Sequence, residues 1–466
     1  MNILQGTTNS WLDAARIGAV LERHDREDRG RVVAILAKAR EMKGLDLDDV
    51  AALMALDDAE LTGELFATAR FVKEEIYGRR MVFFAPMYIT NHCANECLYC
   101  AFRASNDGLV RHALSRDEIV RETEILVDQG HKRVLLVAGE SYPGGLDYVL
   151  EAIAAIYSVE KAGNAIRRVN ANLAPLSTAD FKRLKDAGIG TYQLFQETYQ
   201  RDVYAAVHTK GRKADIDWRL SAFDRAMEAG IDDVGMGVLF GLGDWRFEML
   251  ALMSHIAHLE ERFGVGCHTV SVPRIEPASG AEMASRPPRP VTDADFKKIV
   301  AILRLAVPYT GLIMSTRESA EMRRETYALG VSQISAGSRT NPGGYAATEQ
   351  FDAAQFQLGD HRSLEEVVKD IAAMGYIPSF CTACYRTGRT GEDFMALAKV
   401  GTIKEKCAPN AVGTFLEYLI DYAQPDTAAA GETAIAAEVE EMADKERRVS
   451  ARLIEMVRAG KRDVFC

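Results

Sequence analysis

MVFFAPMYITNHCANECLYCAF, residues 81–102, combines two signals in one stretch. Its first half is an apolar and aromatic run, which is typical of a buried β-strand. Three cysteines follow within eight residues, at positions 93, 97 and 100. Three thiolates on a compact loop can hold three irons of a cubane cluster and leave the fourth iron open to an exogenous ligand. We therefore expect a 4Fe–4S cluster on Cys93, Cys97 and Cys100.

A structural zinc site is the alternative for this loop, because zinc also takes thiolate ligands. Structural zinc normally has four ligands and favours paired CxxC units. The fourth ligand here would be His92, and its position directly before Cys93 makes that geometry awkward.

Outward from this stretch, apolar strand candidates alternate with helical sequence. Seven more runs follow the first: RVLLVAG (133–139), IRRVNANL (166–173), GTYQLF (190–195), DDVGMGVLFG (232–241), HTVSVPR (268–274), YTGLIMST (309–316) and VSQISAG (331–337). Eight strand–helix units predict an α/β fold of the closed (β/α)₈ TIM type, with an open doubly wound sheet as the alternative. Chemistry in such barrels sits at the carboxyl ends of the strands, which is where the three cysteines fall.

Helical sequence flanks the predicted barrel on both sides. The segment 57–78 repeats apolar residues at the helical period. We predict an N-terminal helical extension over residues 1–80, the barrel over 81–345 and a helical C-terminal domain over 346–466.

Composition and charge exclude several classes of function. The formal net charge is −11, whereas nucleic-acid-binding surfaces are normally basic. No uncharged apolar run reaches the roughly 18 residues of a membrane span, and the first residues lack the basic and apolar segments of a secretory signal. We expect a cytoplasmic protein that binds neither nucleic acid nor a membrane.

The C-terminal segment carries a second cysteine group. FCTACYRTGRTGEDFM (380–395) contains Cys381 and Cys384, and Cys407 follows after 22 further residues. A redox dithiol, a zinc site and a second 4Fe–4S cluster all fit such a pattern. The dithiol is the weakest interpretation because no thioredoxin-like strand precedes the motif.

The spacing CxxxCxxC, with Tyr99 before the third cysteine, resembles the signature of the radical S-adenosylmethionine (SAM) superfamily. The resemblance implies a bound SAM, cleaved reductively to methionine and a 5′-deoxyadenosyl radical. It also implies SAM contacts at the matching strand ends, namely Gly139 and Glu140 for the amino group, Glu197 for the ribose, and Gly237 and Gly241 near the adenine.

Both cysteine groups together resemble the HydG family, tyrosine lyases of di-iron hydrogenase maturation. MEAGIDDVG (227–235), DFKKIVAILRLAVPYTG (295–311) and CTACYRTGRTG (381–391) carry this resemblance. It implies that tyrosine is cleaved at Cα–Cβ to p-cresol and dehydroglycine, and that a second 4Fe–4S cluster converts dehydroglycine to carbon monoxide and cyanide. Implied partners are an electron donor of ferredoxin or flavodoxin type and other hydrogenase maturation proteins.

The same resemblance implies an additional iron beside the second cluster, bridged by a free cysteine and held by a histidine. His268 matches that histidine, and imidazole suits iron. A buried histidine of the core is the alternative. The chain departs from the family pattern at Cys267, where a proline is usual, and at Arg339, where relatives often have a small residue or cysteine. Either departure would bear on the second site.

Two arginines are candidates for binding the tyrosine carboxylate, because a guanidinium fork matches its geometry. Arg317, after the seventh strand, is the first candidate and Arg274, after the sixth, is the second. Each is equally typical of a partner in a strand-end ion pair. Asn170 and Asn172 alternate along the third strand and are expected to face the barrel lumen.

Two other functions stay open. A lyase of the ThiH type shares the first cysteine group and would yield p-cresol and dehydroglycine without carbon monoxide or cyanide. It lacks the C-terminal cysteine group, so Cys381, Cys384 and Cys407 separate the two families. A non-catalytic scaffold would instead hold zinc on the same six cysteines.

Overall fold

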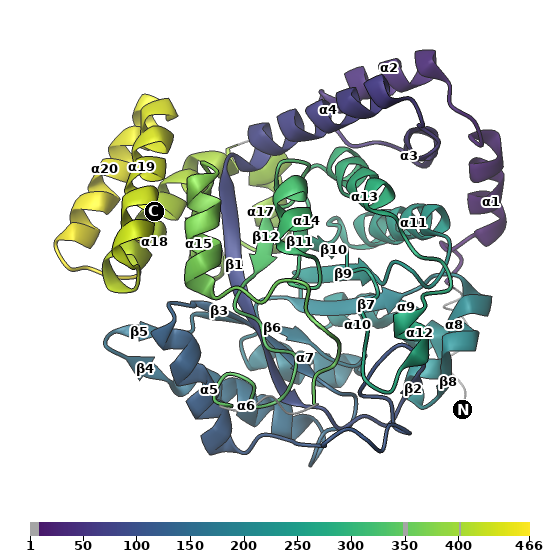
Figure 1. Ribbon diagram of the computed structural model, residues 1–466, viewed down its shortest axis with the longest axis horizontal. Coiled ribbons are helices and arrows are strands. Elements are labelled where there is room, and N and C mark those ends of the chain that lie inside the picture. The colour runs from purple at the N-terminus through teal and green to yellow at the C-terminus, as the bar shows by residue number, and fades with distance from the viewer. Residues whose placement is uncertain (1–8, 348–352, 400–401) are drawn as a thin grey trace.

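The computed structural model describes residues 9–347, 353–399 and 402–466. Its centre is a closed barrel of eight parallel strands (Figure 1). The barrel strands are β1 (Arg80–Thr90), β3 (Arg133–Ala138), β6 (Arg168–Asn172), β7 (Tyr192–Glu197), β9 (Val234–Val238), β10 (Thr269–Ser271), β11 (Gly311–Met314) and β12 (Gln333–Ser335). Each overlaps one predicted run. The barrel closes where β12 pairs with β1, at Val82 opposite Gln333, so the closed barrel is confirmed and the open sheet is wrong.

Helices surround the barrel and turn their apolar faces inward. The larger ones are α5 (Arg116–Asp128), α6 (Leu146–Ser158), α7 (Thr178–Asp186), α10 (Ala222–Glu228), α11 (Trp245–Phe263), α13 (Asp293–Ala306), α14 (Ala320–Tyr327) and α15 (Leu364–Ala373). Side-chain caps fix their starts: Ser115 and Glu118 form a capping box at α5, and Ser177 and Thr292 cap α7 and α13.

Four helices precede the barrel in the described residues. They are α1 (Ala14–Arg23), α2 (Arg29–Ala39), α3 (Leu47–Met54) and α4 (Ala59–Tyr77). The apolar stripe of α4 is fully buried at Leu61, Leu65, Ala69 and Val72, and α4 packs against α13 on the outside of the barrel (Figure 1).

Beyond α15, the described residues of the C-terminal segment add one strand and five helices. β13 (Ile377–Ser379) pairs in parallel with the amino-terminal half of β1, at Arg80 opposite Ile377. Residues 346–466 are therefore not purely helical, because this three-residue strand, with Pro378 at its centre, has no readable period. The helices are α16 (Ala383–Arg386), α17 (Gly391–Lys399), α18 (Ile403–Asp421), α19 (Pro425–Glu441) and α20 (Asp444–Arg458).

Short elements complete the chain. They are β2 (Glu96–Cys97), β4 (Glu160–Lys161), β5 (Asn164–Ala165), α8 (Arg201–Val207), β8 (His208–Lys210), η1 (Arg212–Ala214), α9 (Ile216–Leu220) and α12 (Glu282–Ser285). Within the described ranges, none of the helices combines the length and the apolar character needed to cross a membrane.

Candidate functional site

The first cysteine group lies at the carboxyl end of β1, on a loop anchored by neighbouring elements. Cys93, Cys97 and Cys100 line one cavity of about 180 Å³. β2, which contains Cys97, pairs antiparallel with β8. The hydroxyl of Tyr99 is hydrogen-bonded to Nε2 of the buried His208 (2.8 Å). The three predicted ligands therefore line one cavity, on a loop that a strand pairing and a side-chain hydrogen bond hold in place.

Gly139 directly follows the end of β3 and contacts the cysteine loop. Its N–H donates to the carbonyl of Thr90 (2.8 Å). A Cβ at this position would lie 2.3 Å from the carbonyl oxygen of His92, which is backbone and cannot move aside cheaply. Glycine is therefore required for the close approach of the strand end to the cysteine loop.

Buried charges form a network beside the cysteines. Asn95 Nδ2 donates to Glu140 Oε2 (2.6 Å), and Arg219 donates to Glu140 Oε1 (3.2 Å). Lys213 Nζ donates to Glu197 Oε1 (2.6 Å), with Arg219 3.7 Å from the same oxygen. Burial opposes ionisation of Glu140, but Arg219 and Lys213 outweigh it and lower the pKa of this carboxyl. Glu140 and Glu197 are thus both held in place at the cavity wall by paired cations.

Glu197 has a strained backbone. Its φ is +70°, and the β7–β9 register shifts at this residue. The following turn is held by Glu248 of α11, whose carboxylate accepts from Thr198 Oγ1 (2.5 Å) and from the N–H of Tyr199 (2.8 Å). A non-glycine residue in this conformation costs about 1–3 kcal/mol and persists only where its surroundings enforce it.

Gly237 and Gly241, the two glycines predicted near the adenine, leave room for the side chains of neighbouring residues. A Cβ on Gly237 would meet the ring of Phe195 at 2.5 Å, and Gly241, with φ +118°, lies against Ile275. Phe195, Ile275 and Leu239 line the cavity. The glycines therefore let apolar side chains close in on the space where the resemblance places the adenine.

The two candidate arginines have different surroundings. Arg317 lines the cavity, and its guanidinium stacks on the ring of Phe356 at 3.3 Å. Among the described residues, its guanidinium nitrogens have no hydrogen-bond partner in the structure, and burial lowers its pKa. Arg274 is instead held by the carboxylates of Glu318 and Asp293. Arg317 is thus free to bind a ligand, whereas Arg274 is already neutralised.

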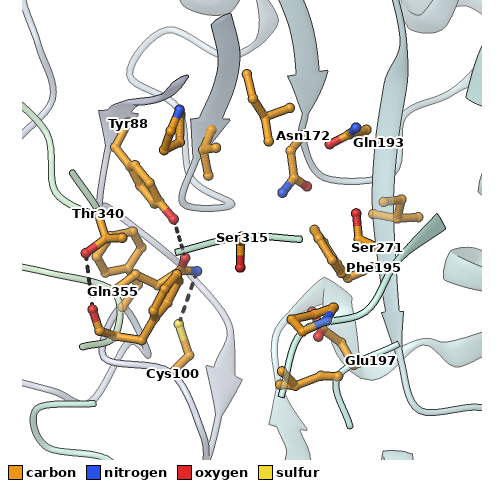
Figure 2. Close-up of a pocket in the computed structure, with 18 of the residues that line it drawn as sticks. Tyr88, Cys100, Asn172, Gln193, Phe195, Glu197, Ser271, Ser315, Thr340 and Gln355 are labelled. Carbon is orange, nitrogen blue, oxygen red and sulfur yellow. Dashed lines mark hydrogen bonds between the residues drawn. The ribbon is translucent and has the colours of Figure 1, made fainter. Parts of the chain in front are cut away.

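Polar side chains run along the barrel lumen. Asn172, Gln193, Ser271 and Ser315 reach into the cavity (Figure 2). One step further along the strands, toward the amino-terminal end of the barrel, Asn170 accepts from Arg168 Nε (2.5 Å). The lumen is therefore lined with hydrogen-bonding groups between the two ends of the barrel, as predicted for the two asparagines.

The second cysteine group lies at the opposite end, near residues that begin strands. Arg133, which begins β3, donates to the carbonyl of Cys381 (2.9 Å). The thiols of Cys384 and Cys407 are neighbours, and their interaction raises the pKa of Cys384 and lowers that of Cys407. The CxxC pair and a cysteine 22 residues away thus meet at one place.

His268 joins this second group. Its ring packs against Phe394 (4.7 Å between centroids), its Nδ1 lies 3.4 Å from Asp233, and its Nε2 lies 3.5 Å from the hydroxyl of Tyr385. Tyr385 directly follows Cys384. Burial, with the nearby arginines, lowers the pKa of His268 to about 3, so the imidazole is neutral and has a lone pair to offer a metal.

The two departures from the family pattern fall at different ends. Cys267 is fully buried and lines a separate cavity of about 330 Å³ between α11, the end of α13 and α17. Arg339 follows β12, donates to the carbonyl of Ser338 (3.1 Å) and stands in the loop whose Ser338 and Thr340 line the first cavity. The surroundings of Arg339 are those of the first site, so the expectation that it bears on the second is not supported by its position.

Comparison with known proteins bears directly on these two sites. Residues 87–253 match the model of the Radical SAM superfamily, and residues 271–377 that of the Biotin and Thiamin Synthesis associated domain. The 2-iminoacetate synthase of Escherichia coli (strain K12) is 31% identical over 75% of this chain and 90% of its own. A crystal structure of HydG, a maturase of the FeFe-hydrogenase, is 45% identical, with a TM-score of 0.95 over 98% of this chain and all of its own.

A second HydG crystal structure, from Carboxydothermus hydrogenoformans, is 41% identical, with a TM-score of 0.84 over 97% of this chain and all of that one. These two matches include the C-terminal cysteine group. The chain belongs to the HydG family. As a radical SAM protein it uses SAM and a 4Fe–4S cluster, which the predicted ligands Cys93, Cys97 and Cys100 are placed to hold.

In this HydG-family chain, several site residues were not found by sequence reasoning: Asn95, Lys213, Arg219, Glu248 and Gln355. They come from loops and helices between the strands and carry no spacing that marks them. A charged or amide residue in a loop is common, so only the fold shows that these meet the strand-end carboxylates and the cysteines. Burial of Arg219 beside two carboxylates, for example, is visible only in the folded molecule.

Proposed function

We propose that this chain is a tyrosine lyase of hydrogenase maturation. It cleaves tyrosine between Cα and Cβ to p-cresol and dehydroglycine, and converts dehydroglycine to carbon monoxide and cyanide at the second cysteine group. One observation supports this most strongly: a cysteine group stands at each end of a single barrel with a polar lumen. The 2-iminoacetate synthase matches over 75% of the chain, whereas the HydG structures match over 97–98%.

The first site has a donor set that fits the group it is proposed to hold. Three soft thiolates from one loop suit iron and leave one metal position for SAM. When bound, the cluster and SAM supply one electron and an acceptor for a hydrogen atom from the tyrosine amino group. The protein's part is to orient the ligands with Gly139, Glu140 and Glu197 and to exclude water from the cavity.

Arg317 and Glu276 are proposed to bind the two charges of free tyrosine. Both line the same cavity, and Glu276 has a pKa raised to about 7 by burial and by Glu318. Arg317 offers its guanidinium to the carboxylate, and Glu276 its carboxylate to the ammonium group. Arg274 is bound to Glu318, so it holds this side of the cavity in place and does not bind the substrate.

The second site is proposed to hold another 4Fe–4S cluster on Cys381, Cys384 and Cys407. An additional iron, bridged by a free cysteine, would be held beside it by His268. A cubane cluster attaches each thiolate to a different iron and can be held by three cysteines, whereas a structural zinc ion normally takes four ligands.

The cellular setting follows from the same chemistry. All eight cysteines are free thiols, which suits a reducing compartment, and we propose a cytoplasmic location. A ferredoxin or flavodoxin would supply electrons, and other hydrogenase maturation proteins would receive the iron product.

Product analysis tests the proposal. The anaerobically reconstituted protein, given SAM, reductant and tyrosine, should release p-cresol together with carbon monoxide and cyanide. The triple variant Cys381→Ser, Cys384→Ser, Cys407→Ser should still form p-cresol but neither diatomic. A Cys93→Ser variant should form none of the three.

Each contrary outcome has its own meaning. p-Cresol without diatomics from the unmodified protein would place it with 2-iminoacetate synthases. No p-cresol, with 5′-deoxyadenosine still formed, would overturn tyrosine as the substrate. Zinc in place of iron after anaerobic purification would favour the non-catalytic zinc-binding scaffold.

A further inference from the structure

A side chain far from the cysteine motif reaches one of its sulfurs. Gln355 lies between β12 and α15, and its Nε2 is 3.7 Å from Sγ of Cys100. Its Oε1 accepts a hydrogen bond from the hydroxyl of Tyr88 on β1 (2.8 Å), so the three groups form a chain (Figure 2). Among the described residues, no other side chain donates to a sulfur of the first cysteine group.

The direction of this hydrogen bond is set by chemistry. A thiolate has no proton and accepts only, so the amide nitrogen of Gln355 must face Cys100. The amide oxygen is then left for Tyr88, whose hydroxyl donates. Tyr88 is 6% exposed, so the residue that holds the amide oxygen is itself buried.

The backbone holds Gln355 against the cysteine loop from two directions. Its N–H donates to the carbonyl of Thr340 (2.9 Å), and its own carbonyl accepts from the N–H of Ala101 (3.3 Å). The residue is therefore fixed to the loop independently of its amide, and a change of its side chain need not release it.

We propose that Gln355 is a positioning residue that raises the reduction potential of the cluster ligated by Cys100, with Tyr88 fixing the orientation of its amide. Reduction places additional negative charge on the cluster and its sulfurs, so an N–H donor stabilises the reduced state more than the oxidised one. Hydrogen bonds to sulfur are among the features that set such potentials. Inside a protein, where the effective dielectric constant is lower than in water, this effect is stronger. The inference rests on the proposed cluster at the first site.

The test is a redox titration of the anaerobically reconstituted full chain, followed by EPR, without tyrosine. Gln355→Leu keeps most of the volume and removes the donor. We expect the ratio of reduced to oxidised cluster at a fixed potential to fall about tenfold, a shift of about 59 mV to more negative potential for one electron. Gln355→Glu should shift it further, because a carboxylate would face the sulfur.

Two variants separate tuning from folding. Tyr88→Phe keeps the ring and Gln355 but frees the amide, so it should shift the potential in the same direction by a smaller amount. Gln357→Leu is the matched control, since the side chain of Gln357 is exposed two residues away, and it should titrate like the unmodified protein.

The outcomes are distinguishable. Equal potentials for the unmodified protein, Gln355→Leu and Tyr88→Phe at equal iron content would overturn the inference, as would a shift to more positive potential. If Gln355→Leu does not retain its cluster, the potential of Tyr88→Phe decides between the two outcomes. A missing cluster signal in the unmodified protein would instead defeat the proposed function itself.

Discussion

Gly139 shows how tightly the first site is packed at the level of single residues. A methyl group there would lie 2.3 Å from a backbone carbonyl of the cysteine loop. We predict that Gly139→Ala displaces the loop, costs about 1–3 kcal/mol of stability and lowers the iron bound at the first site. Gly63→Ala, in α4 with nothing near its Cβ, is the control and should stabilise the chain by up to about 1 kcal/mol. Thermal unfolding and iron analysis report both effects; normal iron loading of Gly139→Ala would contradict the argument.

Lys73 is a buried cation for which the described residues supply no hydrogen-bond partner. It is 0% exposed and lies over the ring of Tyr376 at 4.2 Å, and burial, followed by Arg304, lowers its pKa to about 7. An unfolded lysine titrates near about 10.4, so between these values the unfolded chain binds more protons and stability rises with pH. Lys73→Met should therefore stabilise the protein at pH 7, by on the order of 2 kcal/mol.

Denaturant unfolding at pH 7 and pH 9.5 checks this prediction. The gain from Lys73→Met should shrink at the higher pH, because the unmodified lysine is then neutral when folded. A gain that stays the same at both pH values would show that Lys73 is not the group responsible.

Residue-level prediction from sequence worked where the chemistry demands a local spacing. Cys93, Cys97 and Cys100 sit within one loop, and that spacing needs no tertiary information. Gln355 could not be predicted, because its role depends on a hydrogen bond across 255 positions of the chain. Arg274 and Arg317 looked alike in sequence; only the place of Glu318 distinguishes them.

At the level of elements, α11 supports the strained end of β7. Glu248, 1% exposed, accepts hydrogen bonds from Thr198, Tyr199 and Gln200 and thereby fixes the turn after Glu197. We predict that Glu248→Ala weakens SAM binding about tenfold, the effect of losing about 1.4 kcal/mol of positioning. Equilibrium dialysis of SAM on reconstituted protein measures this.

The control variant for Glu248→Ala lies on the same helix, α11. Glu260→Ala removes a half-exposed carboxylate that pairs with Lys399 and should leave the SAM affinity unchanged. Equal SAM affinities for Glu248→Ala and Glu260→Ala would show that Glu248 does not act through Glu197.

The barrel strands were readable from sequence because parallel strands are buried on both faces and appear as continuous apolar runs. β13 and the β2–β8 ladder were not, since they are short and, unlike β10 and β12, do not lie within a longer apolar run. Their place in the sheet is set by what they pair with, so they become visible only in the folded molecule.

At the scale of the whole molecule, β1, which lies early in the chain, is covered by elements from the C-terminal segment. A protein ending at residue 345 lacks β13 and α18, which cover the amino-terminal half of β1. We predict that it fails to unfold cooperatively, whereas a chain ending at residue 424 keeps both elements and should retain a cooperative transition at a lower temperature. Circular dichroism melting separates them; a cooperative transition for the shorter chain would show that the barrel folds without residues 346–466.

The order of synthesis gives the pairing of β1 a further consequence. β1 is the first barrel strand to leave the ribosome, but its partners Gln333 and Ile377 are translated in the last third of the chain. Pairings that distant in sequence form late and slowly. The carboxyl-terminal half of β1 pairs with β3, but Arg317, Thr340 and Gln355, which complete the cavity around the cysteines, also come from the last third of the chain. We therefore expect Cys93, Cys97 and Cys100 to stay partly uncovered, and open to oxidation, until that part of the chain has been translated.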